Sequence, residues 1–128
     1  MLKVLLIDDS ATTRMLLSQT LPLLSPKPLE IVECETAILG LQELIKNGTE
    51  LPDLIVTDLK MPHMSGEEFL QTVKAHPNYK KIPVVILSGT VSEGNNSKLK
   101  SLGALTVIPK PPPEKSLAKV LHYIQKSK

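Results

Sequence analysis

The sequence predicts an α/β fold in which one doubly wound parallel sheet of five strands is covered by helices on both faces. Two observations lead to this expectation. Short apolar runs alternate five times with helix-length amphipathic segments, and right-handed crossovers place such helices on both sides of a parallel sheet. The 128 residues, 41% of them hydrophobic, fit a single domain spanning residues 1–128.

The first strand, first helix and second strand are predicted in the N-terminal third. Residues 4–7 form an apolar run typical of a strand buried on both faces. Ser10 can cap the helix that follows. Pro22 and Pro26 are expected to end that helix, because proline lacks the backbone N–H that a helix interior uses. Residues 29–33 predict the second strand.

The second helix is predicted at residues 35–46 and is expected to stop at Asn47-Gly48. Its expected apolar face recurs at helical spacing and consists of Ile38, Leu41, Leu44 and Ile45. The third strand is the apolar run at residues 54–57, which ends at Asp58.

A capping box marks the start of the third helix. Ser65 stands three residues before Glu68, so each side chain can accept a backbone N–H at the helix start. This helix is expected to continue to about His76. Residues 84–87 predict the fourth strand, which ends at Ser88.

The last quarter of the chain predicts two helices and one strand. A weak fourth helix is expected near residues 97–102, and a fifth strand at residues 105–108. The final helix is expected at about residues 113–125, since proline is tolerated as a first helical residue. Its apolar face consists of Leu117, Val120, Leu121 and Ile124.

The composition excludes several classes of protein. The only aromatic residues are Phe69, Tyr79 and Tyr123, which disfavours a base-stacking nucleic-acid surface. Cys34 is the only cysteine, so no internal disulfide can form, and we expect it to be a small buried side chain in a reducing compartment. The N-terminal apolar run is too short for a signal peptide or a membrane span. We therefore expect a cytoplasmic protein with no membrane partner.

Charge is distributed unevenly along the chain. Residues 1–93 have eight basic and twelve acidic side chains, a net charge of −4, whereas residues 94–128 have seven basic and one acidic, a net charge of +6. This basic segment at the C-terminus is a candidate docking surface.

Polar and charged side chains follow four of the predicted strands. They are Asp8 and Asp9 after the first strand, Asp58 after the third, Ser88 after the fourth and Lys110 after the fifth. In an open parallel sheet, ligands bind outside the carboxyl ends of the strands, beside the point where the strand order reverses. We therefore expect three carboxylates, a hydroxyl and an ammonium group at one edge of the sheet.

This set of side chains indicates phosphoryl transfer. Three neighbouring carboxylates repel one another unless a cation neutralises them. Their hard oxygen ligands, without histidine or cysteine, suit Mg²⁺ better than zinc. The carboxylate after the third strand can attack a phosphoryl group while the metal and the lysine offset the charge on its oxygens. Each feature alone is common at turns and surfaces, and only their combination at successive strand ends indicates a site.

Four segments together resemble the response-regulator receiver family. They are residues 4–10 (VLLIDDS), 53–66 (DLIVTDLKMPHMSG), 84–89 (VVILSG) and 109–111 (PKP). The resemblance covers essentially the whole chain and implies the flavodoxin-like (βα)5 fold of CheY-like single-domain receivers.

The resemblance implies a phosphoacceptor and a metal site. Asp58 would accept a phosphoryl group from a sensor histidine kinase or a phosphotransfer protein. Mg²⁺ would be the cofactor, bound directly by Asp9, Asp58 and the backbone carbonyl of Lys60, with Asp8 acting largely through water.

The resemblance also implies roles at the other two strand ends. Ser88 would take the hydroxyl switch position and Lys110 would contact the phosphoryl group. The Lys110–Pro111 peptide bond would be cis, as proline permits.

Three positions depart from the family pattern. An aromatic residue is usual three residues before the lysine, where this chain has Val107, and Pro112 stands where phenylalanine is common. Valine cannot reproduce the inward swing of that ring, so the activated state is expected not to depend on an aromatic rotamer. Gly89 is smaller than the frequent alanine, which is expected to leave the site more open.

The predicted function is phosphorylation-dependent protein–protein interaction rather than enzymatic turnover. The alternatives are a phosphorelay intermediate and a receiver fragment of a longer DNA-binding regulator or hybrid kinase. A phosphatase with Asp58 as nucleophile would normally need a second aspartate where Lys60 stands, and a Rossmann-type nucleotide binder would need a glycine-rich loop after the first strand. A downstream protein with an acidic surface is the expected partner of residues 94–128. Direct DNA binding is disfavoured, because the segment has no arginine and no helix-turn-helix is present.

Overall fold

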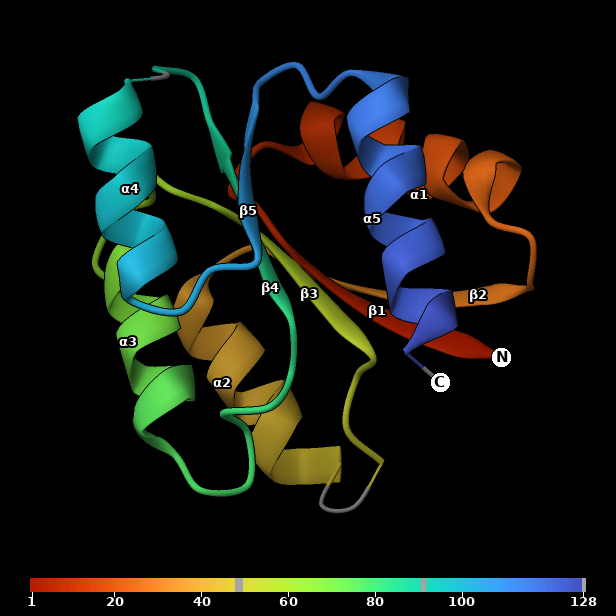
Figure 1. The fold of residues 1–128 in the computed structure, drawn as a ribbon. Helices are drawn as coiled ribbons and strands as arrows, with labels where there is room; N and C mark the ends of the chain where they lie inside the picture. The colour runs from red at the N-terminus through yellow and green to blue at the C-terminus, as the bar shows by residue number, and fades with distance from the viewer. Residues whose placement is uncertain (48–49, 91, 128) are drawn as a thin grey trace.

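The structure is a computed structural model that describes residues 1–47, 50–90 and 92–127 (Figure 1). The strands are β1 (Leu2–Ile7), β2 (Leu29–Cys34), β3 (Leu54–Asp58), β4 (Val84–Ser88) and β5 (Thr106–Pro109). The helices are α1 (Ala11–Leu24), α2 (Ala37–Asn47), α3 (Gly66–Ala75), α4 (Glu93–Ser101) and α5 (Glu114–Lys126). Strands and helices alternate throughout, as predicted. No helix in the described residues is long and apolar enough to span a membrane.

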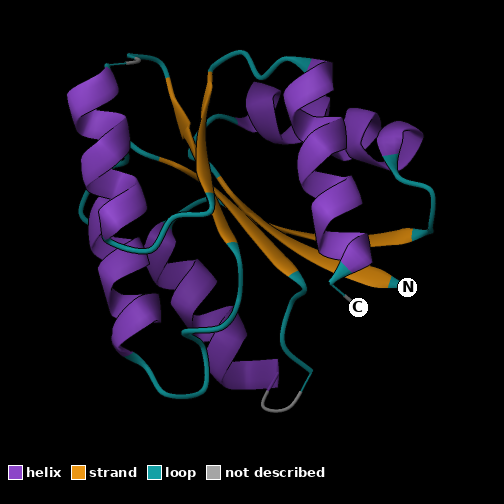
Figure 2. Cartoon of the chain, in the orientation of Figure 1, coloured by secondary structure: helices purple, strands orange, loops and turns teal. Residues whose placement is uncertain are grey.

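The five strands form one parallel sheet in the order β2-β1-β3-β4-β5. The sheet is the middle of three layers (Figure 2). Every residue of β3 and β4 is buried, which explains why these strands read as continuous apolar runs rather than as alternating ones. Strand order reverses at β1, because β2 lies on one side of it and β3 on the other.

Two hydrophobic cores lie on opposite faces of the sheet. Helices α1 and α5 cover one face and α2, α3 and α4 the other (Figure 1). Leu6 and Leu87 belong to the core under α1 and α5, whereas Ile7 and the fully buried ring of Phe69 belong to the other. Cys34 is buried at the edge of this second core, as expected for a small apolar side chain. The α/β fold predicted from the sequence is therefore confirmed.

Serine caps begin the helices where the sequence predicts them. Ser10 accepts the Thr13 N–H at 3.3 Å and begins α1. The capping box of α3 is complete: Ser65 Oγ accepts the Glu68 N–H at 3.1 Å, and Glu68 Oε1 accepts the Ser65 N–H at 3.0 Å. These bonds satisfy donors that a helix leaves unpaired at its first turn.

The prediction that Pro22 ends the first helix is wrong, because α1 continues through Pro22 to Leu24. Leu21 is buried and Leu24 packs against the same core, so tertiary contacts hold the last turn in place. The Ser25 N–H then donates to the Leu21 carbonyl at 3.1 Å and closes the helix before Pro26.

The predicted apolar face of α2 is only partly correct. Leu44 is buried and Leu41 packs against the core, but Ile38 and Ile45 are 44% and 69% exposed. Gly40 is the reason: a Cβ at this position would overlap the side chain of Ile7, so α2 approaches the sheet through small residues.

Helix α4 begins earlier than predicted. Ser92 caps it by accepting the Asn95 N–H at 3.2 Å, and only Leu99 of this helix is fully buried. The predicted stop at Asn47-Gly48 is not tested, because residue 48 lies outside the described residues.

Candidate functional site

The sheet brings the predicted site residues to one edge. Asp8 and Asp9 directly follow β1, Asp58 ends β3, Ser88 ends β4 and Lys110 follows β5. These four strands are consecutive neighbours and run in the same direction, so their carboxyl ends meet, and the reversal of strand order at β1 lies beside them.

Three carboxylates cluster at this edge. One carboxylate oxygen each of Asp8, Asp9 and Asp58 lies within 4.8 Å of the other two. Asp8 is fully buried and Asp58 is 7% exposed, whereas Asp9 is exposed. Two of the three negative charges therefore lie largely out of reach of water.

Lys110 supplies a positive charge to the two buried carboxylates. Its Nζ lies 2.9 Å from Asp8 Oδ2 and 3.2 Å from Asp58 Oδ2. The Lys110 N–H donates to the Ser88 carbonyl at 3.0 Å, which fixes the backbone of this loop to the end of β4. The Lys110–Pro111 peptide bond is cis, as expected.

Burial and charge perturb both partners of this ion pair. Burial raises the pKa of Asp58, the charge of Asp8 raises it further, and Lys110 only partly opposes the change. Burial alone lowers the pKa of Lys110, but its hydrogen bonds to Asp8 and Asp58 and their charges outweigh burial and raise it. Lys110 therefore stays charged. The ionised form of Asp58 is disfavoured unless a further cation binds beside it.

Ser88 is buried beside the acidic cluster, but its hydroxyl contacts its own loop. Ser88 Oγ donates to the Thr90 carbonyl at 2.7 Å and accepts the Thr90 N–H at 3.3 Å. Gly89 is exposed, and a Cβ built on it would meet no atom within 4 Å. Together with Lys110 and Pro111, it lines a cavity of about 340 Å³ beside the site, so this approach is open.

Gly66, the last residue of the segment 53–66 that resembles the receiver family, contributes to the site through its backbone. Its N–H donates to the Leu59 carbonyl at 2.8 Å, and a Cβ on it would overlap the Asp58 carbonyl oxygen. Glycine is thus required for the close approach of α3 to the end of β3. The feature of the sequence that indicates this role of Gly66 is its position directly after the helix cap Ser65.

Arg14 also contributes to the site, and the sequence did not reveal it. Its Nη1 donates to the Asp8 backbone carbonyl at 2.6 Å, and its Nε lies 3.2 Å from Glu33 Oε1. An arginine in the first half of a helix gives no sign by itself that it reaches back to a strand end.

Two further predicted positions lie around the site. Lys60 is exposed in the loop between β3 and α3, two residues after Asp58, and the role of its carbonyl stays a prediction. Val107 is half-buried in β5 and packs against the core under α2, α3 and α4.

The donor set fits a hard divalent cation. The cluster consists of carboxylate oxygens, and the buried Asp8 Oδ2 has the Lys110 ammonium, 2.9 Å away, as its neighbouring cation. Mg²⁺ belongs to the group of hard cations, with Ca²⁺ and Mn²⁺, that such oxygens suit.

Comparison with known proteins gives matches over nearly the whole chain. The family model described as response regulator receiver domain matches residues 4–122. A probable chemotaxis protein CheY from Rhizobium etli is 36% identical over 111 residues, covering 86% of this chain and 81% of that protein. A protein-glutamate methylesterase/protein-glutamine glutaminase from Anaeromyxobacter dehalogenans is 41% identical over 111 residues, covering 85% of this chain. The chain spans only 29% of that methylesterase and 13% of a sensor histidine kinase CheAY from Helicobacter pylori.

Solved structures show the same fold. The signal receiver domain of a DNA-binding response regulator from Colwellia psychrerythraea has a TM-score of 0.86 at 25% identity, covering 98% of this chain and 99% of that one. The chemotaxis protein CheY4 from Vibrio cholerae has a TM-score of 0.82 at 30% identity, covering 97% of this chain and 98% of that one.

Proposed function

Since the chain belongs to the response regulator receiver family, we propose that it is a phosphoacceptor signalling domain in which Asp58 receives the phosphoryl group. Receiver domains act in two-component signalling and interact with histidine kinases or phosphotransfer proteins. One observation carries the assignment to Asp58: its carboxylate lies 3.2 Å from the Lys110 ammonium and is partly exposed, whereas the carboxylate of Asp8, which Lys110 also contacts, is fully buried.

Receiver domains bind Mg²⁺ at an acidic pocket, and the carboxylate cluster of this chain fits that ion. We propose that Asp9, Asp58 and the Lys60 carbonyl bind it directly, with Asp8 acting through water. When bound, Mg²⁺ neutralises charge on the cluster and on the phosphoryl oxygens. Asp58, whose charged form is disfavoured by burial, then becomes an effective nucleophile.

The transfer itself needs little covalent chemistry from the protein. An Asp58 carboxylate oxygen forms a bond to phosphorus as the phosphorus–nitrogen bond of a phosphohistidine donor breaks, and the electron pair returns to the imidazole ring. Lys110 already lies 3.2 Å from Asp58 Oδ2, so it is placed to neutralise a phosphoryl oxygen after a small rotation.

We propose that the Ser88 side chain responds to the phosphoryl group on Asp58. Its hydroxyl would leave the Thr90 carbonyl, to which it now donates at 2.7 Å, and donate to a phosphoryl oxygen. Because Val107 cannot act as an aromatic rotamer switch, the change would pass through the loop after Ser88 and through α4. Helix α4 suits this role, since only Leu99 anchors it fully in the core.

Phosphorylation by a small donor tests the assignment. Incubation with acetyl phosphate and Mg²⁺ should add one phosphoryl group, and Asp58→Asn should abolish the addition. The linkage should be stable to acid and labile to alkali, as an acyl phosphate is. A phosphoserine or phosphohistidine identified by mass spectrometry would contradict the proposal.

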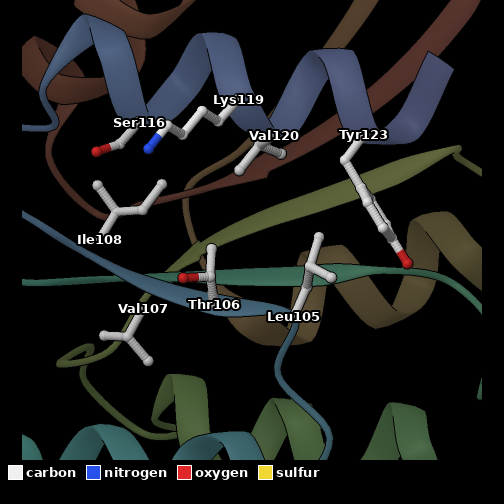
Figure 3. A pocket seen from close by; sticks show the side chains of 8 residues that line it. All are labelled: Leu105, Thr106, Val107, Ile108, Ser116, Lys119, Val120 and Tyr123. Carbon is white, nitrogen blue, oxygen red and sulfur yellow. The ribbon is translucent and has the colours of Figure 1, made fainter. Parts of the chain in front are cut away.

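The output surface that we propose is the basic segment, residues 94–128. A groove of about 330 Å³ lies within it, between β5 and α5. Figure 3 shows Ile108 pointing toward α5 and Val107 pointing away from it. Lys119 and Tyr123 of α5 line the same groove, and the ring of Tyr123 is half exposed. An apolar floor with Lys119 beside it fits a partner that presents acidic and apolar side chains.

Charge reversal tests this surface. Lys98 is left unchanged because it already pairs with Glu67 at 3.4 Å. Partners that the immobilised phosphorylated chain retains are identified and then purified. They should associate more slowly with the double variant Lys115→Glu/Lys119→Glu than with the wild type. Added salt should slow association with the wild type more than with the variant. An unchanged on-rate at low salt would leave the lysines as a solvated surface. Phosphorylation at Asp58 should be unaffected.

A further inference from the structure

The backbone around the two adjacent aspartates is held from several sides. The Asp8 N–H donates to the Cys34 carbonyl at 3.1 Å, and its carbonyl accepts Arg14 Nη1 at 2.6 Å. Asp8 Oδ1 accepts the Ser10 N–H at 2.8 Å. Both ends of the Asp8 residue are thus fixed to neighbouring elements, and Arg14 donates to the carbonyl of the peptide that joins Asp8 to Asp9.

Arg14 is itself held in place by charge. Its Nε lies 3.2 Å from Glu33 Oε1 on β2, while Ser18 Oγ donates to Glu33 Oε2 at 3.0 Å. The Arg14 side chain is only 18% exposed. A largely buried guanidinium that contacts both a carboxylate and a carbonyl holds them in a fixed relative position, because its donors have a fixed planar geometry.

Asp9 needs such a link more than Asp8 does. Its carboxylate is exposed, and within the described residues no hydrogen bond or ion pair holds it. The Asp8–Asp9 peptide fixes the backbone from which this carboxylate extends, so the orientation of the peptide limits the positions that the carboxylate can reach. We propose that Arg14 is a positioning residue that fixes this peptide and thereby aims the Asp9 carboxylate at Mg²⁺, with Glu33 holding Arg14. The proposal rests on the metal-binding function proposed above.

Simple electrostatics predicts the opposite effect, which makes the proposal testable. A guanidinium near a divalent cation repels it, so removing Arg14 should tighten Mg²⁺ binding if charge alone matters. A positioning role requires that the affinity fall. Groups that orient metal ligands typically contribute about 10–100-fold to metal affinity, and we expect a loss near ~10-fold for a single backbone contact.

Arg14→Met removes the donors and the charge while keeping the length of the side chain. The matched control is Lys46→Met, which removes a positive charge from the same hollow that Arg14 and Glu33 line. Titration calorimetry with Mg²⁺ alone should show weaker binding for Arg14→Met and equal or tighter binding for Lys46→Met. Arg14→Lys keeps the charge but loses the planar arrangement of donors that contacts both acceptors, so its affinity should lie between those of Arg14→Met and the wild type.

A second readout separates positioning from general destabilisation. With acetyl phosphate as donor, Arg14→Met should need more Mg²⁺ for half-maximal phosphorylation yet approach the wild-type rate when Mg²⁺ is saturating. Thermal unfolding in EDTA identifies variants that do not fold, and Arg14→Lys decides the question if Arg14→Met is one of them. Unchanged or tighter Mg²⁺ binding in a folded Arg14 variant overturns the inference. A wild type that binds no Mg²⁺ overturns the proposed metal site as well.

Discussion

Replacing the phosphoacceptor with its neutral analogue should stabilise the metal-free fold. Asp58 is buried beside Asp8, and its raised pKa means that folding favours the neutral carboxyl over the ionised one. Asp58→Asn is neutral at every pH, so it escapes this cost. The ionised carboxylate that makes Asp58 a nucleophile therefore lowers the stability of the fold, because it is buried beside the charge of Asp8.

The distances in the site set the size of the effect. The oxygens of Asp8 and Asp58 lie within 4.8 Å, a repulsion of about 3.5 kcal/mol at an effective dielectric constant of about 20. The attraction between Lys110 and Asp58, 3.2 Å apart, is about 5 kcal/mol at the same dielectric constant. The free-energy cost of removing the buried carboxylate from water opposes this attraction. We expect the variant to gain about 1–2 kcal/mol, or about 3–8 °C in Tm.

Urea unfolding in EDTA, followed by circular dichroism, measures this gain. Because the pKa of Asp58 is raised in the folded state, its cost is absent below the ordinary carboxyl pKa and appears as the pH rises through the raised value. The advantage of Asp58→Asn should therefore shrink as the pH falls through that window. Mg²⁺ should also reduce it, since the ion binds the folded wild type more tightly. A variant less stable than the wild type in EDTA at neutral pH would refute the reasoning.

Three further outcomes are expected. Asp9→Asn should lose most of the Mg²⁺ affinity because it removes a carboxylate ligand, and unchanged affinity by titration calorimetry would exclude Asp9 from the metal site. Gly66→Ala should lower the free energy of unfolding by about 1–3 kcal/mol, since its methyl group would overlap the Asp58 carbonyl. Gly89→Ala should change the free energy of unfolding by no more than about 0.5 kcal/mol, and equal effects of the two variants in urea unfolding would contradict this prediction. Lys110→Ala should keep its circular dichroism spectrum but lose the chemical-shift response to phosphorylation, and a variant that simply unfolds would give Lys110 a structural role instead.

The alternation of strands and helices could be read from the sequence because each element carries a local signal. The buried strands β3 and β4 are continuous apolar runs, and the capping box at Ser65 and Glu68 has a fixed spacing. The meeting of Asp8, Asp58 and Lys110 at one edge followed from parallel topology alone.

The sequence did not reveal how closely the helices pack against the sheet. Helix α2 lies so close to the sheet that Gly40, rather than Ile38 or Ile45, faces Ile7. Hydrophobicity ranks glycine low, so the apolar stripe was placed on the larger side chains. Arg14 escaped notice for a related reason: its partner is a backbone carbonyl, and carbonyls have no signature in a sequence.

The environment of Cys34 has a practical consequence for labelling the protein. Burial, with a smaller contribution from Glu43, raises the pKa of its thiol to about 11 although Arg14 acts in the opposite direction. At neutral pH the thiol stays protonated and covered, and it should react slowly with alkylating reagents. Gly89, by contrast, is exposed at the rim of the site with open space around it. A fluorophore attached through Gly89→Cys would thus give a site-specific optical signal for ligand binding in a chain that contains no tryptophan.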